Sequence, residues 1–213
     1  RTTENIVEGN WVWLLNTARD AKVRRIYLLI KQDENNFPSA RTGRTLRSGE
    51  LLVPLRGENT AEGWGNADWL AEFLTLAQAY DIEVHAWWPC FQDAIAAEKF
   101  PHARYKGGQE DVFVDPAFVD IRDRQKYLLA DLLERYPFDG VALDWIRYSA
   151  LKDGAGGPLG QRFEEVTGTK WSNEAMADPL LHATWNDLRA RETADWVKNL
   201  LGELRPSHPT VSW

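Results

Sequence analysis

The sequence predicts an α/β fold of parallel βαβ units, arranged as part of a (β/α)8 barrel. Helical and strand patterns alternate along the whole chain, which favours parallel strands joined by helices. Connections from helix to strand take about one to five residues, whereas connections from strand to helix take about twenty to thirty, so long loops gather at the carboxyl ends of the strands. We expect three strands and the start of a fourth, whereas a complete barrel has eight strands and typically about 250 residues.

In the first half of the chain, apolar periodicity predicts two helices, each followed by a strand. Residues 11–21 carry Val12, Leu15 and Ala18 at helical spacing, and Asn66 caps a second helix with an apolar stripe over residues 70–77. The two strands are nearly continuous apolar runs, at residues 25–32 (RIYLLIKQ) and 82–88 (IEVHAWW). The long connection between these strands contains a short candidate strand at residues 51–55.

The second half repeats the pattern around a third strand. Asp115 as cap and Pro116 in the first turn start a helix that continues to Tyr136. The run 138–148 (FDGVALDWIRY) follows at once, and its short, apolar character between breakers is typical of a buried strand. The remaining expected elements are a short helix near residues 162–166, a helix at residues 185–204 and the start of a strand at residues 210–213.

Asp144 is the one carboxylate inside the apolar core of that third strand. Strand alternation places two sets of side chains on opposite faces: Val141, Leu143 and Trp145 outward, and Ala142, Asp144 and Ile146 toward the barrel interior. A buried ionised carboxylate costs several kcal/mol unless it is paired or hydrogen-bonded. Asp144 therefore has either a functional role or a structural one, as a loop cap or as the ion-pair partner of Arg147.

Composition excludes several classes of function. The formal charge of −7 and the lack of a basic stripe argue against nucleic acid as the main partner. No apolar run reaches the length of about twenty residues that spans a bilayer. The first residue is not Met, so the sequence leaves the cellular compartment open, and export to the periplasm or the medium is one of the alternatives. Cys90 is the only cysteine, and the chain has no CxxC or HExxH motif, so we expect no internal disulfide, no metal and no cofactor. The eleven Trp residues favour carbohydrate binding modestly, because Trp also serves packing.

The strand at residues 138–148 resembles the bacterial glycosyl-hydrolase-like family ten, whose members carry DG-x-x-x-D-[YW]-IRY. The matching residues are Asp139, Gly140, Asp144, Trp145, Ile146, Arg147 and Tyr148. Residues 48–52 (SGELL), residues 82–87 (IEVHAW) and the helix with Trp185 and Arg189 are similar to further family segments in the same order. The resemblance implies a TIM barrel with a carbohydrate cleft, of which this chain holds about strands 2 to 5. Family 18 chitinases are excluded, because Ile146 stands where they carry the catalytic Glu.

Glycoside hydrolysis usually needs two carboxylates, one on each side of the scissile bond. The candidate catalytic residues are Asp144, His85 near the end of its strand, and Asp33 at the start of the following loop. His85 would equally serve as a hydrogen-bonded core residue, and Asp33 as a loop cap. The candidate substrate-binding residues are Lys31, Gln32, Glu83, Trp87, Trp88, Arg147 and Tyr148, with an ion-pair role as the alternative for Glu83.

Two functions of different class follow from these residues. The first is a hydrolase of poly- or oligosaccharides with Asp144 at its centre, and the second is a carbohydrate-binding domain that keeps the cleft without catalysis. A third arrangement puts the catalytic groups on strands outside this sequence. We expect one domain over residues 1–213, incomplete at both ends, whose open barrel is covered by further polypeptide of the same gene or of another copy.

Overall fold

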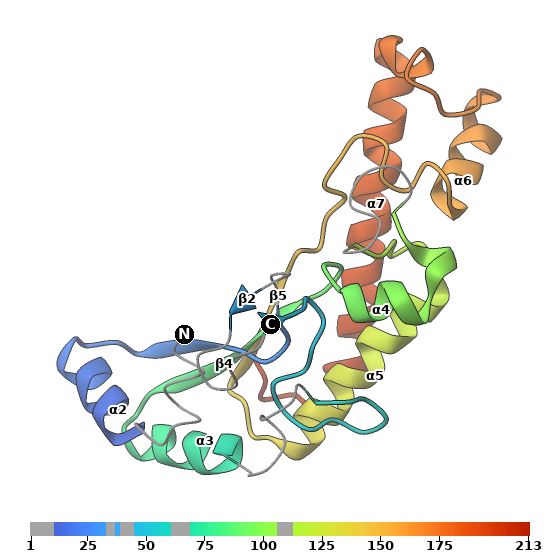
Figure 1. The fold of residues 1–213 in the computed structure, drawn as a ribbon. Coiled ribbons are helices and arrows are strands. Elements are labelled where there is room, and N and C mark those ends of the chain that lie inside the picture. Colours follow the sequence, from blue (N-terminus) through green and yellow to red (C-terminus); the bar gives the residue numbers. More distant parts are fainter. Residues whose placement is uncertain (1–10, 33–36, 39–44, 61–68, 106–112) are drawn as a thin grey trace.

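The protein is described by a computed structural model, which covers residues 11–32, 37–38, 45–60, 69–105 and 113–213 (Figure 1). Its main sheet contains the strands β1 (Arg25–Leu29), β4 (Glu83–Pro89) and β5 (Gly140–Asp144). They pair in parallel in the order β1-β4-β5, so the prediction of parallel neighbours in chain order is confirmed. Ser212 forms a parallel bridge with Gly140, as expected for the start of another strand.

Helices cover the outer face of this sheet. The helices are α2 (Trp11–Asp20), α3 (Trp69–Ala79), α5 (Val119–Arg135) and α7 (Pro179–Leu204). Leu28, Val84 and Val141 point from the strands into the main hydrophobic core, which the helices close from outside. In Figure 1, α2 and α3 lie at the β1 end, whereas α5 and α7 lie at the other end. Alternating strand residues therefore leave a second, inner face of the sheet for polar side chains.

The long loops contain elements that the periodicity does not predict. These are the antiparallel pair β2 (Phe37–Pro38) and β3 (Thr45–Leu46), α4 (Ala94–Lys99), and the 3-10 turns η1 (Pro101–Ala103) and η2 (Ala175–Ala177). The short helix expected near residues 162–166 is α6 (Pro158–Thr167), which ends at Gly168 with φ of 68°. The last helix begins at Pro179 rather than Trp185, because the Asp178 side chain accepts from the backbone N of Leu180 and caps it.

Two predicted boundaries, the start of α5 and the end of β5, are wrong. Helix α5 begins at Val119, and Asp115 is not its cap: the buried Asp115 carboxylate accepts instead from the backbone N of Ala117. Strand β5 ends at Asp144, because Trp145 adopts a left-handed backbone with φ of 54°. A bulky residue in that region breaks the alternation of side chains.

The connection after β5 builds a second hydrophobic core outside the main one. We call residues 149–190 the α6–α7 lobe: it contains α6, η2 and the N-terminal part of α7. Its core joins Leu159, Phe163, Met176 and Trp185 to Tyr105 and Tyr148. Figure 1 shows α6 and the start of α7 extending away from the sheet. The lobe therefore stands beside the carboxyl ends of the strands.

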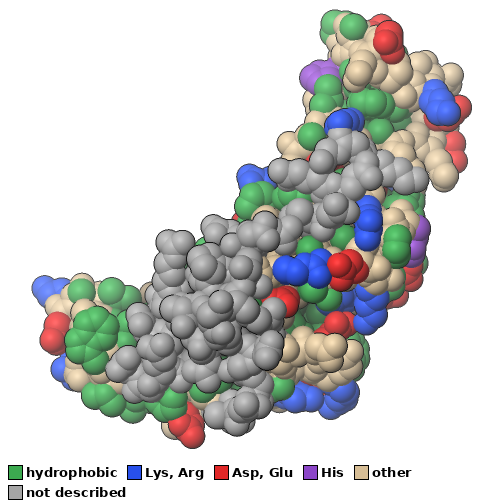
Figure 2. Space-filling model, viewed as in Figure 1, with side chains coloured by type: hydrophobic (Ala, Val, Ile, Leu, Met, Phe, Trp, Pro, Cys, Tyr) green, Lys and Arg blue, Asp and Glu red, His purple; other side chains and the backbone are tan. Residues whose placement is uncertain are grey.

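Several hydrophobic side chains lie at the surface near α2 and β1. Val12 and Trp13 of α2 are 55% and 63% exposed, so only Leu15 and Ala18 of the expected stripe are buried. Tyr27 on the inner face of β1 is 52% exposed. Figure 2 shows hydrophobic surface at this end of the molecule. Within the described ranges, no helix has both the length and the apolar character needed to cross a membrane.

Candidate functional site

Asp144 lies at the carboxyl end of β5, in register with Pro89 of β4, and on the inner face of the sheet. Its Oδ2 accepts a hydrogen bond from Trp87 Nε1 at 3.0 Å, and its Oδ1 accepts from the Trp145 backbone N at 2.7 Å. The strand ends stay joined here, because the Cys90 backbone N donates to the Asp144 carbonyl at 2.8 Å. The carboxylate is partly exposed. Two N–H donors thus fix the orientation of the Asp144 carboxylate.

At Trp145 the backbone turns away from strand β5. The prediction that its ring lies outward with Val141 and Leu143 is wrong, because the left-handed turn interrupts the alternation. The ring instead packs against Phe113, with centroids 5.7 Å apart. The Arg147 guanidinium lies 4.3 Å from the Trp145 ring centroid, and it makes no ion pair with Asp144. The structural alternative of an Asp144–Arg147 pair is therefore not observed.

The loops that follow β4 and β5 form a pocket of about 330 Å³ at the carboxyl end of the sheet. It is lined by Gln92, Phe113, Trp145, Arg147, Tyr148 and Ser149. Its walls come from the loops after β4 and β5, where parallel α/β folds place their sites. Gln92, Phe113 and Ser149 were not predicted, since single polar or aromatic residues in a long loop carry no periodic signal.

A hydrogen bond to the buried Asp115 orients Tyr148 in this pocket. The Tyr148 hydroxyl donates to Asp115 Oδ1 at 2.9 Å, and the Tyr105 hydroxyl donates to the Arg147 carbonyl at 3.1 Å. Burial raises the pKa of Asp115 to about 6. Burial also raises the pKa of the Tyr148 hydroxyl above its usual value. Tyr148 is therefore a neutral hydrogen-bonding group, and the phenol ring is fixed by its carboxyl partner.

His85 and Glu83 lie near the amino end of β4, whereas Asp144 lies at the carboxyl end of β5. The expectation that His85 is near the end of its strand is wrong: His85 pairs in register with Gly140, the first residue of β5. At about 3.3 Å per residue, His85 lies roughly 13 Å along the sheet from the level of Asp144. Burial, and then the charge of Arg25, lower the pKa of His85. Glu83 forms an ion pair with Arg25 at 2.7 Å, which is the structural alternative for this residue.

Lys31 and Trp88 do not reach the cleft, contrary to expectation, because both are fully buried. Lys31 Nζ pairs with Asp93 Oδ2 at 3.0 Å, and Trp88 Nε1 donates to Gln125 Oε1 of α5 at 2.8 Å. Gln32 is also buried, with its backbone bonded to the loop of residues 49–50. Asp33 lies outside the described residues.

Besides Asp144, two carboxylates of the loop after β4 lie near this end of the sheet, and both are engaged. Asp93 pairs with Lys31 and also accepts from the Ala96 backbone N at 2.8 Å. Asp115 is 1% exposed and is bonded to Tyr148. Asp144, by contrast, is a partly exposed carboxylate at the end of β5. The described residues also hold no cluster of three or more His, Cys, Asp or Glu side chains placed to bind a metal ion.

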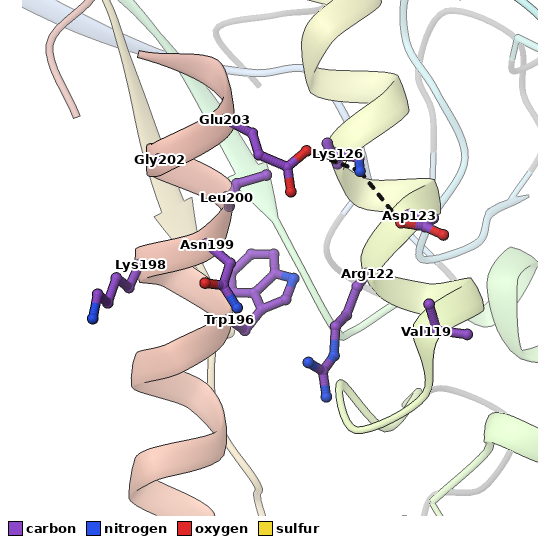
Figure 3. Close-up of a pocket in the computed structure, with 10 residues that line it drawn as sticks. All are labelled: Val119, Arg122, Asp123, Lys126, Trp196, Lys198, Asn199, Leu200, Gly202 and Glu203. Atoms are coloured by element: carbon purple, nitrogen blue, oxygen red, sulfur yellow. Dashed lines mark ion pairs between the residues drawn. The ribbon is translucent and has the colours of Figure 1, made fainter. Parts of the chain in front are cut away.

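A second groove, of about 500 Å³, lies between α5 and α7 on the outside of the fold (Figure 3). Trp196 and Leu200 of α7 face Val119 and Arg122 of α5 across it. Lys126 spans the groove by pairing with Glu203 at 3.0 Å. This is the space between neighbouring helices, and it contains no strand end, so the pocket beside Asp144 is the better candidate site.

Comparison with solved structures identifies the kind of fold. No protein-family model matches the sequence, and a search of curated proteins finds no match. The chain is similar to the PgaB (BpsB) glycoside hydrolase domain from Bordetella bronchiseptica, with 17% identity and a TM-score of 0.70, covering 93% of this chain and 56% of that one. It is also similar to alpha-L-fucosidase isoenzyme 2 from Paenibacillus thiaminolyticus, with 13% identity, a TM-score of 0.57, and 88% and 27% of the two chains covered.

A third similar structure is the GH20 exo beta-N-acetylglucosaminidase from Vibrio harveyi, with 12% identity, a TM-score of 0.55, and 89% and 31% of the two chains covered. These similarities support a glycosidase-like TIM-barrel fold, and the three-stranded parallel sheet is consistent with part of such a barrel. The chain spans about half the length of the first of these structures and less than a third of the other two. At these identities the similarity concerns the fold, and the roles of single residues stay predictions.

Proposed function

We propose that this chain is a glycoside hydrolase-like domain that hydrolyses glycosidic bonds of a poly- or oligosaccharide, with Asp144 as its essential carboxylate. The observation that carries this proposal is the position of Asp144. It lies at the carboxyl end of a parallel strand, on the inner face, where two N–H donors hold it, and the next residue, Trp145, lines the pocket. In TIM barrels, catalytic residues come from the ends of strands on this face.

The resemblance to the bacterial family ten fits the same residues. Asp139 Oδ2 accepts from the Val84 backbone N at 2.8 Å and so joins the start of β5 to β4. Gly140 leaves space for the His85 ring. Asp139 and Gly140 thus position the strand, whereas Asp144, Trp145, Arg147 and Tyr148 shape its functional end.

Hydrolysis of a glycosidic bond needs one carboxylate as nucleophile or base and a second group as acid. The hydrogen bonds from Trp87 and from the Trp145 backbone orient the Asp144 carboxylate at the end of its strand, and we assign it the role of nucleophile or base. His85 is too far along the sheet to act with it. Asp33, which follows β1 in the sequence, stays the predicted second carboxylate.

Asp144→Asn tests the proposal, because Asn keeps the size of the side chain and loses its charge. We expect kcat on a panel of polysaccharides to fall by about 100-fold or more, while the melting temperature stays near that of the wild type. The carbonyl oxygen of the introduced amide can still accept one of the two hydrogen bonds, which should preserve the turn at Trp145. A variant that melts early and keeps its specific activity would end the catalytic assignment.

One observation favours the second candidate, a carbohydrate-binding domain without catalysis. Asp93 and Asp115, two described carboxylates of the loop after β4, are both buried and engaged, so neither is free to act as the second acidic group that hydrolysis needs. Glycan binding by the wild type, equal binding by Asp144→Asn and no release of reducing ends would establish this candidate.

A further inference from the structure

The pocket beside Asp144 contains a cation that no described carboxylate neutralises. Arg147 is exposed, and the structure gives its guanidinium no ion pair and no hydrogen bond within the described ranges. By contrast, Lys31, which follows β1, is paired with Asp93 at 3.0 Å. Arg147 therefore keeps its charge available to a ligand in the pocket that it lines.

The Arg147 side chain is also held in place before any ligand arrives. Its guanidinium lies on the Trp145 ring at 4.3 Å, and stacking on an aromatic face leaves the N–H groups at the edge free for other partners. The Tyr105 hydroxyl fixes the Arg147 carbonyl at 3.1 Å. The left-handed turn at Trp145 costs backbone energy, and such turns persist where the surrounding structure enforces them. Less side-chain entropy is therefore lost when a ligand binds.

Another residue that lines the pocket offers a hydrogen-bond acceptor. Gln92 Oε1 is buried and takes no hydrogen bond from a described donor. A buried carbonyl oxygen without a partner costs free energy, and a ligand hydroxyl would satisfy it. The pocket thus combines a planar cation with a hydroxyl acceptor, over a volume of about 330 Å³.

We propose that this pocket is a subsite for an acidic sugar, in which Arg147 binds the anionic group by a bidentate contact and Gln92 accepts from a ring hydroxyl. The inference rests on the proposed function, since it assigns a substrate class to the same cleft. A guanidinium fork matches a carboxylate or a sulfate in geometry. The net charge of −7 opposes polyanions at long range, but physiological salt screens this beyond about 8 Å. Recognition is then a local property of the pocket.

Isothermal titration at about 150 mM salt, where charges are screened as in physiological solution, tests the inference with matched pairs of oligosaccharides. The probes are oligogalacturonides and their methyl esters, chondroitin sulfate oligosaccharides and their desulfated forms, and neutral xylo-oligosaccharides. We expect one acidic probe to bind the wild type about 10- to 100-fold more tightly than its neutral counterpart. Arg147→Gln should remove that difference, and Arg147→Lys should restore it in part, because Lys keeps the charge without the fork.

Arg205→Gln is the matched control, since it removes the same charge from an exposed position at the end of α7. It should keep the preference for the acidic probe. Acidic and neutral forms that bind equally, or a preference that Arg147→Gln leaves intact, would overturn the inference. Hydrolysis of a neutral glycan that Asp144→Asn abolishes would keep the proposed function while refuting the acidic subsite, whereas failure of every glycan to bind would refute both.

Discussion

Gly140 occupies a position where a side chain has no room. A Cβ atom at this residue would lie 2.3 to 2.7 Å from three atoms of the His85 ring, and His85 is 4% exposed. The glycine therefore lets the imidazole lie across the start of β5, while Asp139 fastens the same point to β4 through the Val84 backbone N. The first two residues of the DG motif are thus explained by packing.

Gly140→Ala should destabilise the protein by about 1–3 kcal/mol, because the ring or the strand must move to admit the methyl group. Chemical denaturation followed by circular dichroism would measure the change. Gly202→Ala is the matched control: nothing lies within 4 Å of its Cβ position in α7, and it should stabilise the helix by about 0.5–1 kcal/mol. Equal effects of the two substitutions would contradict this account.

Asp115 links the site to the pH dependence of stability. Its pKa is raised by burial from 3.8 to about 6, so between these values the folded state binds more protons than the unfolded state. The protonated Asp115 therefore contributes to the free energy of unfolding below about pH 4. This contribution, about 3 kcal/mol in all, is lost as the pH rises through about 6.

Asp115→Asn should remove that loss and make the protein more stable than the wild type at about pH 7, since Asn keeps an acceptor for Tyr148 and Ala117. Urea denaturation at intervals from about pH 4 to about pH 8 would show the difference between the two proteins growing with pH. Asp195→Asn, at an exposed position of α7, should leave the wild-type profile unchanged. A difference that does not vary with pH would count against the raised pKa.

Among the elements, those with strong periodicity were predictable and those fixed by tertiary contacts were not. The three strands and four long helices follow from apolar runs and stripes, which local sequence contains. Asp144 was found by the same means, because an acidic residue inside an apolar strand is conspicuous. The turn at Trp145 was not predictable, since a bulky residue seldom adopts positive φ and only its packing against Phe113 and Arg147 selects it.

The burial of Lys31 shows the same limit. At the sequence level a lysine after a strand is expected to reach solvent, whereas here it meets Asp93, which lies 62 positions later in the chain. Gly49, with φ of 88°, packs directly on the Asp93 carboxylate, and Ser48 accepts from the Ala94 backbone N. The SGELL segment thus connects the loop after β1 to the loop after β4 through packing and hydrogen bonds.

Asp93→Asn should destabilise the protein by about 3–5 kcal/mol, because it leaves the buried Lys31 ammonium without a counter-charge. Burial works to lower the pKa of Lys31, which makes the charged form costly without its partner. Asn still caps α4, so loss of the cap is not a competing cause. The double variant Lys31→Met/Asp93→Asn should recover much of the loss in thermal unfolding. A single variant as stable as the wild type would show that the pair is unimportant.

At the scale of the molecule, the described residues form two hydrophobic cores. The main core lies between the sheet and the helices, and the second joins the α6–α7 lobe to Tyr105, Phe113 and Tyr148. Phe163 is fully buried in the second core, edge-on to Trp185 with centroids 5.6 Å apart. Among the described residues the two cores share no buried side chain, so we expect the lobe to open without unfolding the sheet.

Phe163→Ala should cost the lobe about 3–5 kcal/mol through the cavity it leaves. Hydrogen exchange should then speed up over α6 and the start of α7, while β4 and β5 keep their protection. Phe73→Ala, at a fully buried position of α3 in the main core, should instead speed exchange in the sheet. Faster exchange throughout the molecule in both variants would mean that the cores unfold as one.

A lobe with its own core also bears on how such a protein diversifies. Tyr148 and Ser149 line the pocket at the point where the chain leaves β5 for the lobe, whereas Asp144 is held by β4 and by its own turn. Insertions, deletions or exchanges in the lobe would therefore reshape one wall of the pocket without disturbing the carboxylate. Natural selection for new glycans would act most freely on that segment, and a grafted lobe would be the most direct way to redirect specificity in the laboratory.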